Sequence, residues 1–404
     1  MQRSSIRSFT LVELLIVIAI LAILAASVVI VLNPGEMISE ARDAERVTSL
    51  DSLKRSIDLF ILDNPSASLG TLQRVYISIP SSNSDCTGVA GLPTLPSGWS
   101  YVCSTSLSYK KTDGTGWIPL NLGNIYGGSP ISSLPIDPIN DSVSGKYYTY
   151  VMGGSYALSA LFESQKSFAL KDGGQYPEMY EQGTNLSLLP VSHDPSLMGY
   201  WKMDEASGST IIDSSGKGKD GTVSNNPQRV DGKIGKAMWF AGASDQKSIV
   251  TSRYNNLTRF SLFTWAKLYS IEGAGAGFRI IMGSQKGNNI DSGLVTNGNK
   301  IGYHDYVTSG DLNILSSANV MTLNEWHFVG LTYDNGIMRI YCDGADVGGS
   351  NFIKTNTTGD TVIGGAGTYD YSGGRMWDGL IDSARIYSRT LSSSEVRSIY
   401  DSEK

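Results

Sequence analysis

The chain has 404 residues, which is enough for two or three domains, and it carries a net charge of −6. An acidic chain without a cluster of Lys and Arg argues against a nucleic-acid-binding protein, which needs a basic face. The 3 cysteines and 3 histidines show no zinc-type spacing, so no zinc site is predicted. With 45 glycines and only 17% charged residues, the composition favours loop-rich β-structure over helical bundles.

Residues 9–32 form an apolar run of 24 residues in which Glu13 is the only charge. As a helix rising about 1.5 Å per residue, the run would be roughly 36 Å long and would cross a hydrocarbon core of about 30 Å. Arg3 and Arg7 precede it without an acidic residue, which favours a cytoplasmic N-terminus. The run is too long for a cleaved secretory signal peptide. We therefore expect a single-pass precursor whose later residues lie outside the membrane.

The helix is predicted to continue to residue 65 as an amphipathic segment. Apolar residues recur there at spacings of three and four and give one apolar face: Val47, Leu50, Leu53, Ile57 and Phe60. Pro34-Gly35 predicts a kink between the two halves. Asn64-Pro65 predicts the end of the helix.

The segment SFTLVELLIVIAILAILA closely resembles the N-terminus of type IV pilins and pseudopilins. The resemblance implies that a prepilin peptidase removes residues 1–8 by cutting between Ser8 and Phe9, and that Phe9 is then N-methylated. It also implies that Glu13 neutralises the terminal amine of a neighbouring subunit in a fibre. The family prefers Gly where this chain has Ser8, which puts the efficiency of cleavage in question. The alternative is a plain signal anchor in which Glu13 lies near the lipid headgroups.

Residues 66–170 are predicted to form a small α+β head, with strand-like runs between Gly/Ser/Asn-rich loops. Export of this region favours a disulfide between Cys86 and Cys103 over two free thiols. Cys342 is expected to be a small buried residue. The stretch LPIDPINDSVSGKYYTYVMGGSYALSALFES resembles the end of a pseudopilin headpiece. Its acidic loop would bind calcium in some relatives, but turn formation is the favoured role of Asp137, Asn140 and Asp141.

Residues 171–195 lack periodicity and are rich in Gly, Pro and polar residues, so they are predicted to be a linker. Residues 196–404 show many short strand-like runs and read as a separate two-sheet β-sandwich. Asn335-Gly336 predicts a hairpin turn, and Ser392 with Glu395 predicts a capping box for a late helix.

The order of the motifs in residues 198–400 is similar to that of laminin-G-like, concanavalin A-type jelly rolls. The resemblance rests on LMGYWKMDEASGSTIIDSSGKGKDGTV, FSLFTWAKL, WHFVGLTYDNGIMRIYCDG and WDGLIDSARIYSRTLSSSEV. The expected fold class is therefore α+β: a long pilin helix with a small α+β head, followed by an all-β jelly roll. The resemblance implies ligand binding, often of carbohydrate and often with calcium, and it names no ligand.

Two sets of candidate binding residues follow from this second resemblance. Asp204, Asp213 and Asp382 match motif positions that can hold calcium in relatives, with buried turn-forming aspartates as the competing interpretation. Four tyrosines in Gly-rich, loop-like stretches are candidates for contact with a sugar: Tyr303, Tyr306, Tyr369 and Tyr371. Strand tryptophans are expected in the core instead: Trp201, Trp239, Trp265 and Trp326.

No Glu-x-Asp-x-x-Glu motif, serine elbow or P-loop occurs in residues 196–404, so we expect no catalysis and no required cofactor, with calcium as a candidate ion. The expected function is a minor or tip subunit of a type IV pilus, which moves from the cytoplasmic membrane to the cell surface. Its partners would be other pilin subunits, the prepilin peptidase, the assembly machinery, and an extracellular glycan or protein. The alternatives are a pseudopilin of a type II secretion or DNA-uptake system and an anchored surface lectin that never polymerises.

Overall fold

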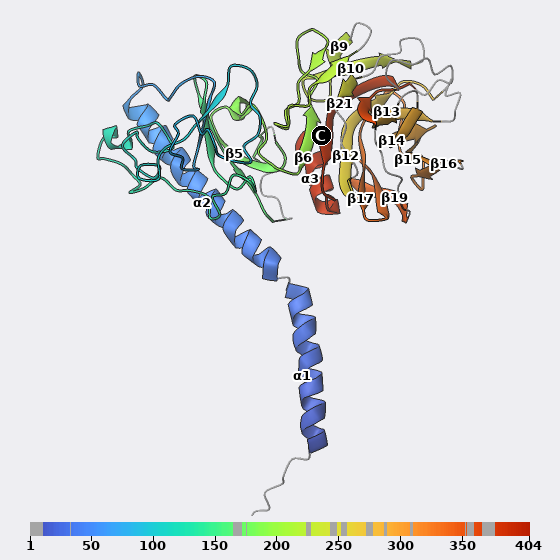
Figure 1. Ribbon diagram of the computed structural model, residues 1–404, viewed down its shortest axis with the longest axis horizontal. Coiled ribbons are helices and arrows are strands. Elements are labelled where there is room, and N and C mark those ends of the chain that lie inside the picture. Colours follow the sequence, from blue (N-terminus) through green and yellow to red (C-terminus); the bar gives the residue numbers. More distant parts are fainter. Residues whose placement is uncertain are drawn as a thin grey trace, which may run out of the picture.

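The computed structural model describes residues 11–32, 34–164, 172–174, 176–223, 228–242, 249–251, 257–271, 278–286, 289–307, 310–351, 353, 359–365 and 376–404. The chain begins with two consecutive helices, α1 (Leu11–Leu32) and α2 (Pro34–Asp63). Figure 1 shows α1 standing clear of the rest of the molecule, while α2 runs into the first globular unit. Pro34 is the first residue of α2, where its missing N–H costs nothing, and Figure 1 shows that α1 and α2 run in different directions.

One face of α2 is buried in the head. Leu50, Leu53, Ile57 and Phe60 lie in an apolar cluster with aromatic residues such as Trp117. These are the residues whose spacing predicted an apolar face, and Asn64 follows the helix end. Two short 3-10 helices, Leu122–Asn124 and Leu186–Leu188, lie in the loops of the head.

The head contains a five-stranded sheet with the order β2-β1-β3-β4-β5. Its first pair is parallel and the others are antiparallel. Alternate side chains of the sheet point to α2 on one face and to the C-terminal sandwich on the other, so both faces are buried. The strands are β1 (Arg74–Ile77), β2 (Ser100–Val102), β3 (Thr149–Met152), β4 (Tyr156–Leu161) and β5 (Met179–Gly183).

Strand β5 corrects the predicted linker over residues 171–195. Met179 to Gly183 pair with β4 and complete the sheet of the head. The segment is rich in Gly and polar residues because β5 is a short edge strand, and its burial comes from packing against the rest of the molecule. The prediction of a linker is therefore wrong for these residues, and the head extends beyond residue 170.

Cys86 and Cys103 form a disulfide that closes a loop across 17 positions of the sequence. Both residues are buried in the cluster shared by the head and the sandwich. We expect a Cys86→Ala/Cys103→Ala double variant to lose about 3 kcal/mol of unfolding free energy, because the loop is no longer constrained in the unfolded chain. Urea unfolding would measure the loss. A reductant should destabilise the wild type by a similar amount and leave the double variant unchanged. An effect of the reductant on both proteins would contradict a stabilising role of this disulfide.

The C-terminal unit is a sandwich of two antiparallel sheets, which confirms the expected jelly-roll class. The first sheet has the order β19-β18-β17-β12-β21-β10-β9, with β6 also paired to β21. Its strands are β6 (Leu197–Trp201), β9 (Gln228–Asp231), β10 (Lys236–Ala241), β12 (Arg259–Leu268), β17 (Trp326–Asp334), β18 (Ile337–Cys342), β19 (Ala345–Asn351) and β21 (Asp378–Tyr387).

The second sheet has the order β16-β15-β14-β13-β20-β11-β8-β7. Its strands are β7 (Thr210–Ile211), β8 (Gly221–Val223), β11 (Ile249–Thr251), β13 (Arg279–Lys286), β14 (Asn289–Asn297), β15 (Lys300–Val307), β16 (Gly310–Leu315) and β20 (Asp360–Ile363). Asn335 and Gly336, both at positive φ, make the expected hairpin turn between β17 and β18. The chain closes with α3 (Ser393–Glu403), whose Ser392–Glu395 capping box is present.

The first sheet of the sandwich is apolar on both faces. Its inner face packs against the second sheet around Trp201, Met238 and Leu331. Its outer face presents Phe263 and Trp265 to α3 and to the head. Trp201 and Trp265 are core residues as expected, whereas Trp239 and Trp326 are only partly buried. The head and the sandwich thus share one apolar cluster, and Figure 1 shows α3 on the side of the sandwich near the head.

Candidate functional site

The N-terminal helix presents an uncovered apolar surface. Every residue from 11 to 21 of α1 is exposed, including Leu11 at 77% and Leu21 at 58%. Glu13 lies in the first turn of this helix, where the helix dipole favours a negative charge. The predicted processing residues Ser8 and Phe9 lie outside the described residues. An apolar helix surface that is exposed in this way needs lipid or other helices around it.

Among the described residues, no helix combines the length and the apolarity that a membrane crossing requires.

A buried ion network fixes α2 to the head. Arg46 is fully buried and donates to both carboxylate oxygens of Asp137, at 2.6 and 2.9 Å, and to Asp43 at 2.7 Å. It also pairs with Glu163, 2.5 Å away, which Arg42 reaches from the surface side. Burial alone would lower the pKa of Arg46, but Asp137, Glu163 and Asp43 raise it above its ordinary value. The network joins the helix to two head segments that lie far along the chain.

Asp137 therefore has a structural role. Asn140 accepts a hydrogen bond from the Ser78 hydroxyl at 2.7 Å, and Asp141 accepts one from the amide of Ser144 at 2.8 Å. The favoured interpretation of this acidic loop as turn-forming agrees with these contacts. The sequence does not predict the role of Arg46. The one available signal is that this charged residue lies next to Val47, which belongs to the apolar face of the helix.

The contact between head and sandwich is aromatic and charged. The ammonium of Lys202, from the sandwich, lies 4.4 Å from the ring centre of Tyr176, which belongs to the head. Arg385 lies over the ring of Tyr200 and pairs with Glu403 of α3. Unpaired polar atoms of Tyr176, Glu181, Arg385 and Tyr387 gather in the same region, as judged among the described residues.

The histidines are buried and do not lie on the surface. His193 contacts the ring of Tyr147 at 4.6 Å between centroids, and its Nδ1 lies 2.7 Å from the carbonyl oxygen of Gly145. Burial lowers the pKa of His193 to about 4. His304 and His327 are also buried, in strands of the sandwich.

Of the predicted sugar-contacting tyrosines, the structure describes the side chain of Tyr303 alone. Tyr303 lies in strand β15 and is 2% exposed, so its assignment to an exposed loop is wrong. The Gly-rich stretch around it is a strand paired with β14 and β16, and a Cβ on Gly302 would collide with the carbonyl oxygen of Ile314 in β16. Tyr306 belongs to the same strand, but its side chain lies outside the described part of the chain. Tyr369 and Tyr371 are outside the described residues altogether.

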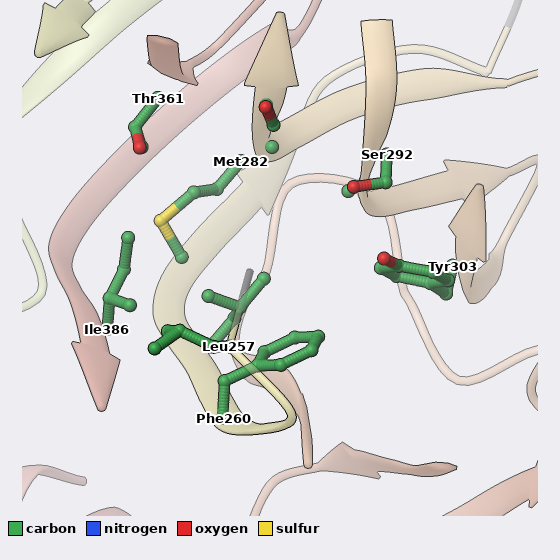
Figure 2. A pocket seen from close by; sticks show the side chains of 11 residues that line it. Leu257, Phe260, Met282, Ser292, Tyr303, Thr361 and Ile386 are labelled. Carbon is green, nitrogen blue, oxygen red and sulfur yellow. The ribbon is translucent and has the colours of Figure 1, made fainter. Parts of the chain in front are cut away.

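Tyr303 lines a small cavity between the two sheets (Figure 2). The cavity has a volume of about 60 Å³. Hydroxyl groups and apolar side chains share its wall, among them Ser292, Thr361, Leu257, Phe260, Met282 and Ile386. Burial raises the pKa of Tyr303 well above its ordinary value. The cavity is too small for a sugar ring with its hydroxyls, so Tyr303 acts as a core residue here.

The three candidate calcium aspartates bind backbone amides. Asp382 is fully buried and accepts hydrogen bonds from the amides of Lys233 and Ile234, each at 2.9 Å. Burial, aided by the charge of Asp204, raises the pKa of Asp382 to about 7. Asp204 accepts from the amide of Lys236 at 2.7 Å, so these two carboxylates flank one turn.

Asp213 belongs to a different turn. Its oxygens accept from the amides of Tyr200, Ser215 and Lys219 at 2.9–3.0 Å. Asp204, Asp213 and Asp382 therefore do not converge as a ligand set, and their oxygens are already engaged. These residues do not fit a shared calcium ion, and the turn-forming interpretation explains their contacts.

One other group in the described part of the chain brings three candidate metal ligands within 4.8 Å: His327, Cys342 and Asp343. His327 Nδ1 lies 2.8 Å from Asp343 and its Nε2 lies 3.0 Å from the amide nitrogen of Thr322. Both ring nitrogens thus have protein partners, and Cys342 is a buried thiol 3.8 Å away. Hydrogen bonding explains the arrangement without a metal ion.

Two family models match the chain. Residues 3–29 match the prokaryotic N-terminal methylation motif. Residues 215–397, from just before β8 into α3, match the concanavalin A-like lectin/glucanases superfamily in its laminin-G form. No curated protein matches the chain.

Solved structures resemble about half of the chain at low identity. The binding domain of paraclostridial mosquitocidal protein 1 is 15% identical over 51% of this chain and 52% of its own length, with a TM-score of 0.42. Domain 4 of AbnA, an extracellular arabinanase from Geobacillus stearothermophilus, solved with arabinotriose, is 20% identical over 50% of this chain and 98% of that domain, with a TM-score of 0.40. Trypanosoma rangeli sialidase is 19% identical over 53% of this chain and 33% of its own, with a TM-score of 0.38.

The methylation motif takes in most of the apolar helix α1, and the lectin-like match covers most of the β-sandwich at the other end of the chain. The chain therefore carries the N-terminal methylation signal of type IV pilins, joined through a small α+β head to a laminin-G-like, concanavalin A-like domain.

Proposed function

We propose that the chain is a minor or tip subunit of a type IV pilus that displays its lectin-like domain for adhesion. The observation that carries the proposal is the exposed apolar surface of residues 11–21 of α1, which lie within the methylation motif. Helices of this kind bury their side chains when several of them bundle. Assembly with other pilin subunits is thus the proposed role of residues 9–32, and Glu13 supplies the charge that pairs with a neighbour's amine.

The proposed life cycle begins in the cytoplasmic membrane. The precursor is anchored through residues 9–32 with its C-terminus outside, is cut before Phe9 by a prepilin peptidase, and then joins the fibre through the pilus assembly machinery. The apolar run and the Arg3 and Arg7 flank support this topology.

The minor or tip position is supported by how the sandwich is attached. A flexible linker would have allowed the domain to swing clear of a crowded shaft. Instead, β5 belongs to the head, and the head and the sandwich share one apolar cluster. Every copy of the subunit would carry the sandwich beside α2. This favours a position in the fibre where few copies are needed.

We propose a binding role for the sandwich, with a glycan or a surface protein as the ligand and without catalysis. Support comes from the lectin-like family match and from the absence of a paired-carboxylate motif in the sequence of residues 196–404. A pseudopilin of a secretion or DNA-uptake machine and an anchored lectin are the competing functions. The first would contact exported substrate, and the second would stay in the membrane.

Immunogold labelling of isolated fibres with an antibody against the sandwich tests where the subunit lies in the fibre. We expect gold at fibre ends or at rare points along the shaft, because the attached domain limits how many copies fit. An antibody against the major subunit of the same fibres is the control and should label the whole length. Dense regular labelling of the shaft by the sandwich antibody would contradict a minor or tip role, and labelling of membranes alone would favour the anchored lectin.

A further inference from the structure

The loop between Cys86 and Cys103, here called the disulfide loop, reaches from the head to the sandwich. Its residues 87–99 form turns and irregular backbone, and the disulfide joins its two ends. The amide of Thr94, near the middle of the loop, donates a hydrogen bond of 2.7 Å to the carbonyl oxygen of Gly216 in the sandwich. This bond joins backbones that belong to different domains.

The contact at Gly216 leaves no room for a side chain. Gly216 is buried and lies at φ +75°, and a Cβ built on it would lie 2.3 Å from the Cβ of Pro93. Glycine alone allows both this backbone conformation and this close approach without strain. The fit between the two domains therefore depends on where the disulfide loop holds Pro93.

The head holds the disulfide loop in place. The Tyr101 hydroxyl donates a hydrogen bond of 2.9 Å to the carbonyl oxygen of Pro93. Apolar side chains of the loop also pack into the cluster that the head and the sandwich share: Val89, Leu92, Leu95, Trp99 and Tyr101. Because residues 87–99 have no helix or strand of their own, the disulfide is the covalent constraint on the path of the loop.

The sandwich side of the contact is held by Asp213. Its carboxylate accepts from the amides of Ser215 and Lys219, on either side of Gly216, and from the amide of Tyr200 in β6. The turn that carries Gly216 is thereby tied to a strand of the first sheet. Asp213 thus fixes the carbonyl group that accepts the hydrogen bond from the loop.

The rest of the contact between head and sandwich is partly unfavourable. Among the described residues, buried polar atoms without a hydrogen-bond partner occur on both sides: the hydroxyl of Tyr176 and Oε1 of Glu181 in the head, and Nε of Arg385 in the sandwich. Leaving such groups unpaired opposes docking. Domains with a partly polar contact are expected to move relative to one another unless something else holds them.

We propose that the disulfide loop, residues 86–103, locks the sandwich in one orientation on the head. When the contact at Gly216 is lost, the sandwich separates from the head while both domains stay folded. Each domain keeps a core of its own, around Trp117 in the head and around Trp201 in the sandwich. The lock goes beyond the adhesive role of the sandwich and does not depend on fibre assembly.

Amide hydrogen exchange of the full-length chain in detergent, measured by mass spectrometry, tests the lock. The amide of Thr94 reports on the contact itself. The amide of Ser192, from the segment between β5 and β6, donates to the carbonyl oxygen of Ser214 at 3.1 Å and reports on docking outside the loop. We expect Gly216→Ala to speed exchange of both amides at least tenfold, because its Cβ collides with Pro93. The amides of β3 and β17 should keep their wild-type protection.

The Cys86→Ala/Cys103→Ala variant should have the same effect on both reporters, although neither cysteine contributes to the hydrogen bond of Ser192. Gly298→Ala is the matched control. Gly298 also lies in the sandwich at positive φ, +56°, but a Cβ built there meets no atom within 4 Å. This variant has the same kind of backbone strain without the collision, and it should exchange like the wild type.

The proposal is overturned if Thr94 and Ser192 keep their wild-type exchange rates in Gly216→Ala, or if only that variant responds and the cysteine variant does not. Equal acceleration in Gly298→Ala would also overturn it, since backbone strain alone would then be the cause. Faster exchange of β3 and β17 in the same proportion would mean that the domains unfold together, which contradicts separation of folded domains. None of these outcomes involves α1, so incorporation of the same variants into fibres reports separately on the proposed pilus function.

Discussion

Replacing Glu13 with Gln should remove the chain from sheared fibres while leaving its amount in the membrane unchanged. The described side chains of α1, residues 11–21, are exposed, so in the proposed fibre their helical neighbours come from other subunits. A carboxylate carried into such a bundle is unfavourable unless a cation meets it, and in the proposed fibre that cation is the new amine of a neighbouring chain. Removing one member of an ion pair that is shielded from water costs about 3–5 kcal/mol.

At that cost, the fraction of chains that join a fibre should fall by more than a hundredfold. Quantitative blotting of sheared and membrane fractions measures the change. Glu45→Gln is the matched control, because it removes the same charge from an exposed position of α2 and should assemble normally. Fibres that contain the Glu13→Gln chain at the wild-type level would contradict a role of Glu13 in assembly. Glu13 would then be a charge that is accommodated near the lipid headgroups, as in a plain anchor.

Arg46→Met should cause the largest loss of folding stability among single substitutions in α2. The variant leaves Asp43, Asp137 and Glu163 facing one another inside the head without their shared cation. Breaking a buried pair in this way costs about 3–5 kcal/mol. Calorimetric unfolding of the detergent-solubilised chain measures the loss. Arg55→Met, at an exposed position of the same helix, is the control and should change stability by no more than about 0.5 kcal/mol.

The same network makes a prediction about pH. Burial would raise the pKa of Glu163, but hydrogen bonds from Arg42 and Arg46 lower it below its usual value of 4.5. A carboxyl group with a lowered pKa contributes stability above its unfolded pKa and loses that contribution as the pH falls through the folded value. The wild type should therefore lose stability below about pH 4.5 more steeply than Arg46→Met. Parallel acid-unfolding curves for the two chains would contradict the assignment.

The features that could be predicted from the sequence depend on local chemistry. The change of helix direction near Pro34, the hairpin at Asn335-Gly336 and the capping box at Ser392 each follow from residues that are neighbours in the chain. The lectin-like sandwich was recognisable because its motifs follow one another in a fixed order over about 200 residues.

The features that were missed depend on contacts between distant parts of the chain. Strand β5 has a linker-like composition and is ordered by pairing with β4. Arg46 meets Asp137 from 91 positions away. The disulfide loop joins Thr94 of the head to Gly216 of the sandwich, which no spacing in the sequence places together. The Gly-rich composition around Tyr303 predicts a loop, but the stretch is strand β15, since glycine also permits close packing between strands.

The most direct test of the pilus function is the mass of the N-terminal peptide from protein sheared off cells. A chain that begins at N-methylated Phe9 in the fibre fraction is the predicted result, since it requires both cleavage after Ser8 and export into a fibre. A chain that still begins at Met1 and stays in the membrane fraction would contradict the function and leave an anchored binding protein.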